Sequence, residues 1–120
     1  MPARSIFRVA AVFNIIVALL LLFGRAKVGL YLGLMPTTGS NALFADLAAV
    51  LIGVFGALYF AISFDPGWLR PVIPFGIAGK LLAFLVVMFH LAVGDITWTL
   101  ASLSFGDLIF AGLFWLCLLG

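Results

Sequence analysis

The chain has 120 residues, of which 67% are hydrophobic and 8% are charged, and its formal net charge is +2. Soluble domains average about 45–50% apolar and about 25% charged residues, and a small protein exposes a large share of its surface, so the composition excludes an ordinary water-soluble domain. No cluster of Lys and Arg exists that could neutralise several phosphates, so nucleic acid is not an expected partner.

Four long apolar stretches fill most of the chain, at residues 5–24, 43–64, 71–93 and 98–119. A helix needs about 20 mostly apolar residues to cross a bilayer, and each stretch meets that requirement. The sequence therefore predicts a single all-α domain over residues 1–120. It is expected to be a polytopic integral membrane protein, built as an antiparallel bundle of four transmembrane helices.

The first helix is expected to begin near Ser5 as its N-cap, and to be retained rather than cleaved as a signal peptide. Residues 25–42 form the longest connection, and their apolar part, residues 28–35, is too short to span and is expected to lie in the interface or to dip back toward the bilayer. Ser40 or Asn41 is the predicted cap of the second helix.

Two short connections join the later helices. Residues 65–67 (Asp-Pro-Gly) predict a tight turn, and the third helix is expected to begin around Pro71. Gly94 ends that helix, with Asp95 or Thr97 as the next cap. Because these connections are short, helices two and three, and helices three and four, are predicted to be antiparallel neighbours.

Basic residues indicate an orientation through the positive-inside rule. An internal N-terminus places Arg4, Arg8 and Arg70 in the cytoplasm and leaves Arg25 and Lys27 outside. The expected location is a cell membrane, the bacterial inner membrane, crossed several times with both termini in the cytoplasm.

Small residues recur every four positions along the second stretch. Such a small-xxx-small pattern lets helix backbones approach closely. It indicates packing inside the bundle or, alternatively, an interface with a second copy or a partner membrane subunit. The residues are Ala45, Ala49, Gly53, Ala57 and Ala61, with Gly56 widening the stripe.

Three polar residues, Asn14, Lys80 and Asp107, lie near the middle of their stretches, and Ser104 shares a helix face with Asp107. A charge at the centre of a membrane helix costs about 2.5–3.5 kcal/mol or more, so it usually faces a partner or a wet cavity. Two interpretations stay open. The Lys80–Asp107 pair either fixes the helix register, or forms a polar binding pocket or proton-responsive site.

A second polar layer is predicted toward the outer face from Arg25, Asp46 and His90. Asp46 shares the small-residue face and is expected to point into the packing. The three residues either line a vestibule that leads to the midplane or are simply solvated at the interface. His90 is the only histidine, so a haem held by two histidines is excluded. No catalytic set, metal site or cofactor is predicted, and the chain is not expected to be an enzyme.

Arg8, the segment Gly24-Arg25-Ala26-Lys27 and a glycine-rich second helix resemble the DoxX-like family of small bacterial four-helix membrane proteins. The resemblance implies a bundle sometimes associated with quinone-linked redox complexes, and it supplies no catalytic residue. Small multidrug transporters have a similar size, but they need a glutamate in the first helix, where this chain has Asn14.

The leading functional hypothesis is an accessory subunit or a small-ligand-binding bundle built around the Lys80–Asp107 site. The alternative is an oligomeric proton-coupled transporter of small molecules, and a further alternative is a partner of a quinone-linked redox complex. In all three hypotheses, the helices are surrounded by the lipid bilayer.

Overall fold

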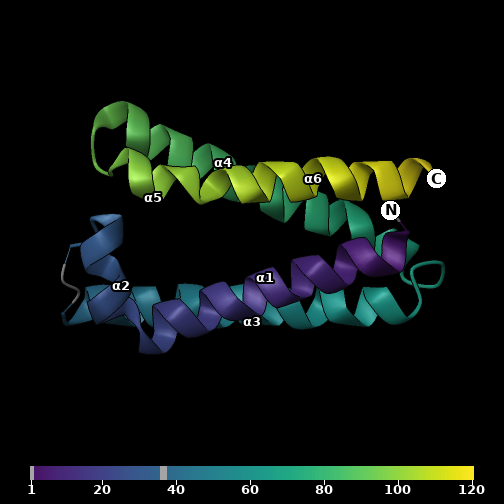
Figure 1. Cartoon of the computed structure of the whole chain (residues 1–120), viewed down its shortest axis with the longest axis horizontal. Coiled ribbons are helices and arrows are strands. Elements are labelled where there is room, and N and C mark those ends of the chain that lie inside the picture. Colours follow the sequence, from purple (N-terminus) through teal and green to yellow (C-terminus); the bar gives the residue numbers. More distant parts are fainter. Residues whose placement is uncertain (1, 36–37) are drawn as a thin grey trace.

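A computed structural model describes residues 2–35 and 38–120, and its elements within these ranges are all helices (Figure 1). The predicted all-helical class is confirmed. Pro36 and Thr37, in the predicted long connection, lie outside the described residues. In the described part, four helical segments are long and apolar enough to cross a membrane, namely Ala3–Phe23, Ser40–Phe64, Arg70–Val93 and Trp98–Leu119.

The long helices alternate in direction, so that both termini lie at the same end of the molecule (Figure 1). We call this the terminal end, and the opposite end the α2 end. The elements in chain order are α1 (Ala3–Phe23), α2 (Arg25–Leu32), α3 (Ser40–Phe64), the 3-10 turn η1 (Arg70–Val72), α4 (Ile73–Val93), α5 (Trp98–Ser102) and α6 (Ser104–Leu119).

The helix boundaries differ from the predicted ones by a few residues. Helix α1 already begins at Ala3 with Pro2 at the N-cap, so Ser5 lies inside the first turn and is not the cap. Helix α3 begins at Ser40 after Gly39, whose φ of 57° is one that glycine adopts readily. The third segment starts as a 3-10 turn and becomes α-helical at Ile73.

The fourth apolar stretch is divided at Leu103 rather than continuous as predicted. The hydroxyls of Ser102 and Ser104 donate to the carbonyls of Thr99 and Ala101, each at 2.7 Å. Serine side chains that bond to the preceding turn compete with the backbone ladder and disturb a helix. Leu103 keeps right-handed helical angles (φ −64°, ψ −30°), so only the hydrogen-bond ladder changes there.

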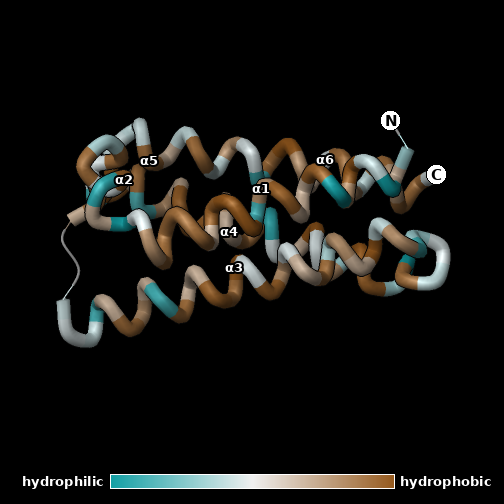
Figure 2. The backbone as a smooth tube through the Cα atoms, turned by 60° about the horizontal axis from the view of Figure 1, so that its bottom comes forward, coloured by the Kyte–Doolittle hydropathy of each residue, from teal (hydrophilic) through white to brown (hydrophobic). Residues whose placement is uncertain are grey.

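The helices are arranged as two tight pairs, α1 with α3 and α4 with α6. Close approach within the first pair depends on Gly56, where an added Cβ would lie 3.1 Å from the Cβ of Asn14 and 3.0 Å from the Cδ1 of Ile15. Helices α3 and α4 touch at few positions, which corrects the prediction that these consecutive helices pack as neighbours. In Figure 2 they diverge toward the α2 end.

The stripe of small residues does not form one packing face. Ala49 is 1% exposed and Gly53 would place a Cβ 3.5 Å from that of Ala18 on α1, but Ala57 and Ala61 are exposed. Positions four apart drift by about 40° per step around a helix of 3.6 residues per turn. The stripe therefore winds off the α1 interface: of the two neighbouring residues assigned to it, Gly56 packs against α1 and Ala57 is exposed.

An aromatic core closes the bundle at the terminal end. The rings of Phe7 and Phe114 stack with centroids 4.4 Å apart, and Tyr59 packs against Phe114 at 5.0 Å. Gly76 makes room for Tyr59, because a Cβ there would lie 3.1 Å from the ring. All four long helices contribute to this core, which joins the two helix pairs.

Helix α2 lies across the opposite end, between the two helix pairs (Figure 1). The hydroxyl of Thr97 donates to the carbonyl of Leu32 at 2.8 Å and accepts from the amide of Leu100 at 3.2 Å. Thr97 is thus the N-cap of α5 and also ties α5 to α2. Gly33 ends α2 with a φ of 75°, directly against the side chain of Thr97.

Large apolar side chains cover the outside of the helices. Leu82, Phe89 and Ile109, for example, are 61%, 61% and 62% exposed. Hydrophobic residues extend over most of the helical length, whereas the turns at the ends are more polar (Figure 2). Soluble monomers rarely expose apolar surface on this scale, so the outer surface is suited to lipid.

Candidate functional site

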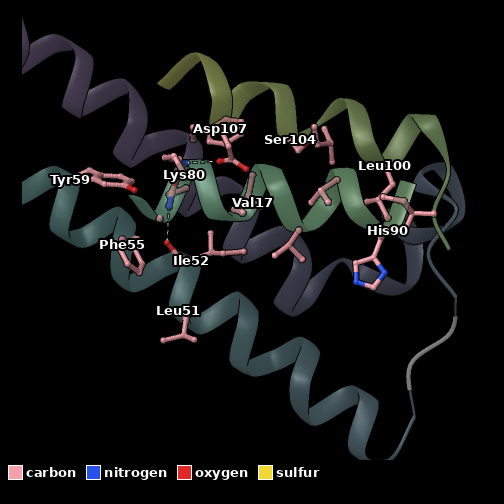
Figure 3. Close-up of a pocket in the computed structure, with 18 residues that line it drawn as sticks. Val17, Leu51, Ile52, Phe55, Tyr59, Lys80, His90, Leu100, Ser104 and Asp107 are labelled. Carbon is pink, nitrogen blue, oxygen red and sulfur yellow. Dashed lines mark hydrogen bonds and ion pairs between the residues drawn. The ribbon is translucent and has the colours of Figure 1, made fainter. Parts of the chain in front are cut away.

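The ammonium group of Lys80 lies at the centre of a buried polar cluster. Its Nζ donates to Asp107 Oδ1 at 2.8 Å and to Asn14 Oδ1 at 2.7 Å (Figure 3). The side chain of Lys80 is 5% exposed and that of Asp107 is 22% exposed. The three polar residues of the apolar stretches therefore meet, and they come from α1, α4 and α6.

Asn14 links this cluster to the remaining long helix. Its amide Nδ2 donates to the backbone carbonyl of Ile52 on α3 at 3.1 Å. Asn14 can reach the Ile52 carbonyl because Gly56, one turn further along α3, lets α1 approach closely. Both ends of the Asn14 amide are thereby used, and the cluster connects all four long helices.

Three aromatic rings surround the charge of Lys80. Its Nζ lies 5.1 Å from the ring centroid of Phe13, 5.5 Å from that of Tyr59 and 5.4 Å from that of Phe110. Cation–π contacts of this length stabilise an ammonium by about 0.5–2 kcal/mol, more when water is excluded. Gly106 admits the Phe13 ring, since a Cβ there would lie 3.2 Å from it.

Asp107 is the member of the cluster with a hydrogen-bond acceptor that no described residue uses. Its Oδ1 accepts from Lys80, whereas its Oδ2 has no hydrogen-bond partner among the residues that the structure describes. The hydroxyl of Tyr59 likewise forms no hydrogen bond within residues 2–35 and 38–120. Both side chains line the same cavity.

That cavity lies between the two helix pairs and has a volume of about 460 Å³. This is within the range of about 300–1,000 Å³ that is usual for small-molecule sites. The polar cluster forms one end, and the aromatic core closes the bundle behind it. The remaining walls are mainly apolar and include Val17, Leu51, Phe55, Ala83, Val87 and Leu100 (Figure 3).

His90 lines the cavity toward the α2 end, on α4 like Lys80 but almost three turns further along (Figure 3). Its Nδ1 lies 2.8 Å from Asp95 Oδ2, in the turn that follows the helix. The two side chains are 45% and 58% exposed. The cavity therefore has a titratable residue at each end, and apolar walls in between.

Arg25 and Asp46 lie apart from the cavity lining. They form an ion pair of 3.0 Å that ties the start of α2 to α3, and Arg25 also donates to the Leu21 carbonyl at 3.1 Å. Asp46 has a side chain that is 51% exposed, so the expectation that it points into the packing is wrong. Of the two interpretations of Arg25, Asp46 and His90, the shared vestibule does not form in the described part of the chain, where Arg25 pairs with Asp46 and His90 pairs with Asp95.

Ser104 lines the cavity as well, 4% exposed, with its hydroxyl directed to the carbonyl of Ala101. Among the described residues it forms no hydrogen bond with Lys80. The sequence alone did not identify the rings of Phe13, Tyr59 and Phe110 as the surroundings of the ammonium. The glycines opposite these rings, such as Gly76 and Gly106, are the only local pattern that could have indicated them.

No protein-family model matches this chain, and no curated protein or solved structure is similar to it. The resemblance to the DoxX-like family therefore stays a prediction.

Proposed function

We propose that this chain is a multi-pass membrane protein that binds a small, mainly apolar molecule from the bilayer in the cavity beside Lys80 and Asp107. Four apolar helices with lipid-suited outer surfaces support the membrane setting. Arg4, Arg8 and Arg70 belong to the terminal end and only Arg25 and Lys27 to the α2 end, which favours cytoplasmic termini.

The cavity is the observation that carries the proposal. Membrane helices gain most of their association energy from close packing, so a space of about 460 Å³ between helix pairs forfeits contacts. A bound molecule restores those contacts. The polar cluster at one end supplies a fixed point that would orient the molecule.

Saturable photolabelling tests this proposal. A phenyl diazirine, which is small and apolar, is added to the protein in lipid nanodiscs, and the labelled residues are mapped by mass spectrometry. We expect saturable labelling of cavity residues such as Leu100 and Val87. Ala83→Phe, which fills the cavity wall, should abolish it. Ala78→Phe is the matched control, because Ala78 is also exposed on α4 and does not line the cavity.

Labelling that rises without saturation, or that Ala83→Phe leaves unchanged, would show that the cavity holds no ligand. The two variants must melt within a few degrees of each other, so that the comparison reports on the cavity and not on folding.

A proton-coupled transporter is the second candidate, and the position of His90 favours it. His90 and Asp107 face the same cavity from opposite ends, so a proton could be exchanged at either end while a small molecule occupies the space between. If the protein is such a transporter, proteoliposomes with a pH-sensitive dye inside should show proton movement across the membrane that depends on an added solute. His90→Gln should abolish that movement while leaving saturable photolabelling intact.

A further inference from the structure

The polar end of the cavity offers an acceptor whose partner is missing. Lys80 is already engaged by Asn14, Asp107 and three aromatic rings, and the Asn14 amide already donates to the Ile52 carbonyl and accepts from Lys80. Asp107 Oδ2 is the acceptor that no described residue engages, on a side chain that is 22% exposed and lines the cavity. A carboxylate oxygen only accepts hydrogen bonds, so the molecule that completes this site must donate one.

We propose that the cavity selects neutral, lipid-soluble alcohols, whose hydroxyl donates to Asp107 Oδ2 and whose apolar part lies along the cavity walls. This inference rests on the ligand-binding function proposed above and names its ligand class. The unbonded hydroxyl of Tyr59 lines the same end of the cavity and is a second polar group for the oxygen of such a ligand.

The charge of the cluster excludes cationic donors. Lys80 balances Asp107 at 2.8 Å, so a protonated amine would meet an ion pair that is already neutral and would bring a second cation close to Lys80. A ketone or an ether has no proton to donate and leaves Asp107 Oδ2 unpaired. An uncharged donor therefore fits both the hydrogen bond and the charge, and the hydroxyl of an alcohol is the simplest such donor among lipid-soluble molecules.

The bilayer makes this polar contact decisive. Lipid tails are about as apolar as the cavity walls, so an aliphatic chain gains packing contacts in the cavity but no hydrophobic transfer free energy when it leaves the lipid. A hydroxyl in the hydrocarbon region lacks partners, and a hydrogen bond to a charged group is among the stronger ones. On this basis we expect an alcohol to bind on the order of tenfold to a hundredfold more tightly than an alkane of equal length.

The divergence of α3 and α4 gives such a molecule a way in from the lipid. In Figures 2 and 3 the two helices separate toward the α2 end. Leu51 on α3 and Val86 on α4 both line the cavity, and both are 58% exposed. Near Lys80 the same gap is filled, because the Phe55 ring packs 3.5 Å from the position of a Cβ on Gly79. Entry therefore occurs beyond Phe55, between Leu51 and Val86.

Competition against the phenyl diazirine tests the ligand class on the unaltered protein. In nanodiscs, 1-decanol should reduce saturable labelling at a membrane concentration at least tenfold lower than 2-decanone or n-decane requires. These three probes have equal chain length, so they differ mainly in the polar group. Equal competition by all three would overturn the selectivity for alcohols while leaving the cavity as a ligand site. Saturable labelling that none of them displaces would also overturn it.

The role of Asp107 is tested with the double variant Lys80→Met with Asp107→Asn, which leaves no unpaired charge. We expect it to lose the preference for 1-decanol over 2-decanone, because an amide can donate to a ketone as well as accept from an alcohol. Ser102→Ala, an exposed change elsewhere on the same apolar stretch, should keep the preference. A double variant with the unaltered preference would contradict the assignment to Asp107.

A separate variant tests the path by which the molecule enters the cavity. Leu51→Trp narrows the gap toward α4 and should slow the onset of competition by 1-decanol several-fold, with the final level unchanged. Leu47→Trp is the control, because Leu47 is exposed on the same helix and does not line the cavity. Equal rates for the two variants would show that the molecule enters elsewhere.

Discussion

Removing one member of the Lys80–Asp107 pair should cost much more stability than removing both. Breaking a buried ion pair from one side typically costs about 3–5 kcal/mol, because the remaining charge is left without a partner. Replacing both groups by residues of similar shape is often neutral. The variants are Lys80→Met, Asp107→Asn and the two combined.

The surroundings of the two groups predict which single change is worse. Asp107→Asn leaves the ammonium of Lys80 in a site that is 5% exposed, with no balancing charge and only neutral partners, namely the new amide, Asn14 and three rings. Its cost should approach the upper part of that range, about 4–5 kcal/mol. Lys80→Met leaves the carboxylate of Asp107, which is 22% exposed toward the cavity and more accessible to water. Its cost should be nearer about 3 kcal/mol.

Unfolding in mixed micelles with an increasing fraction of SDS, followed by circular dichroism, measures these free energies. The double variant should recover most of the loss, which corresponds to a coupling energy at or above the upper part of the usual range of about 0.5–3 kcal/mol. If the two single costs simply add in the double variant, Lys80 and Asp107 are not energetically coupled. If Lys80→Met proves the more destabilising change, our account of the exposure of Asp107 is wrong.

Three further outcomes follow from the packing. Gly56→Ala should destabilise the bundle by about 1–3 kcal/mol in the same assay through overpacking against α1, whereas Gly112→Ala, with open space at its Cβ, should not; equal effects would mean that α1 and α3 are not in close contact. Thr97→Val should cost about 1–2 kcal/mol through loss of the α5 cap, and hydrogen exchange of α2 should rise; unchanged α2 exchange would contradict the link to Leu32. Cysteines introduced at Ala3 and Gly120, in a Cys117→Ala background, should react equally with a membrane-impermeant thiol reagent, and labelling of only one would refute the topology.

The helices were predictable from long apolar runs, and the polar cluster from three polar residues within those runs. Long apolar runs leave the backbone no alternative to helix in a bilayer, so the four segments follow from composition. A lysine and an aspartate at similar depth have a strong reason to pair, and Asn14, Lys80 and Asp107 do meet. The depth of each residue along its helix was therefore sufficient to predict that the three side chains meet.

Rotation around each helix was harder to predict than depth. Asp46 was assigned to the packed face, yet it turns outward to Arg25. Ala57 was assigned to the interface that Gly56, its neighbour, occupies. A stripe repeating every four residues does not match the helical period of 3.6, so its direction changes along the helix and depends on where the partner helix begins. The sequence contains no direct information on that starting point.

The cavity exists because the helix pairs pack together at the terminal end but not toward the α2 end. The pattern of apolar residues in the sequence does not indicate this difference. At the terminal end, Gly76 lets Tyr59 pack against Phe114 and the helix pairs come together. Toward the α2 end the facing positions are Leu51 and Ala83, which are as apolar as the residues in the core but do not interlock. In water such a gap would collapse, because apolar surface is driven together. In lipid that force is absent, so an open half can persist beside a packed half, and the unpartnered oxygen of Asp107 stays accessible within it.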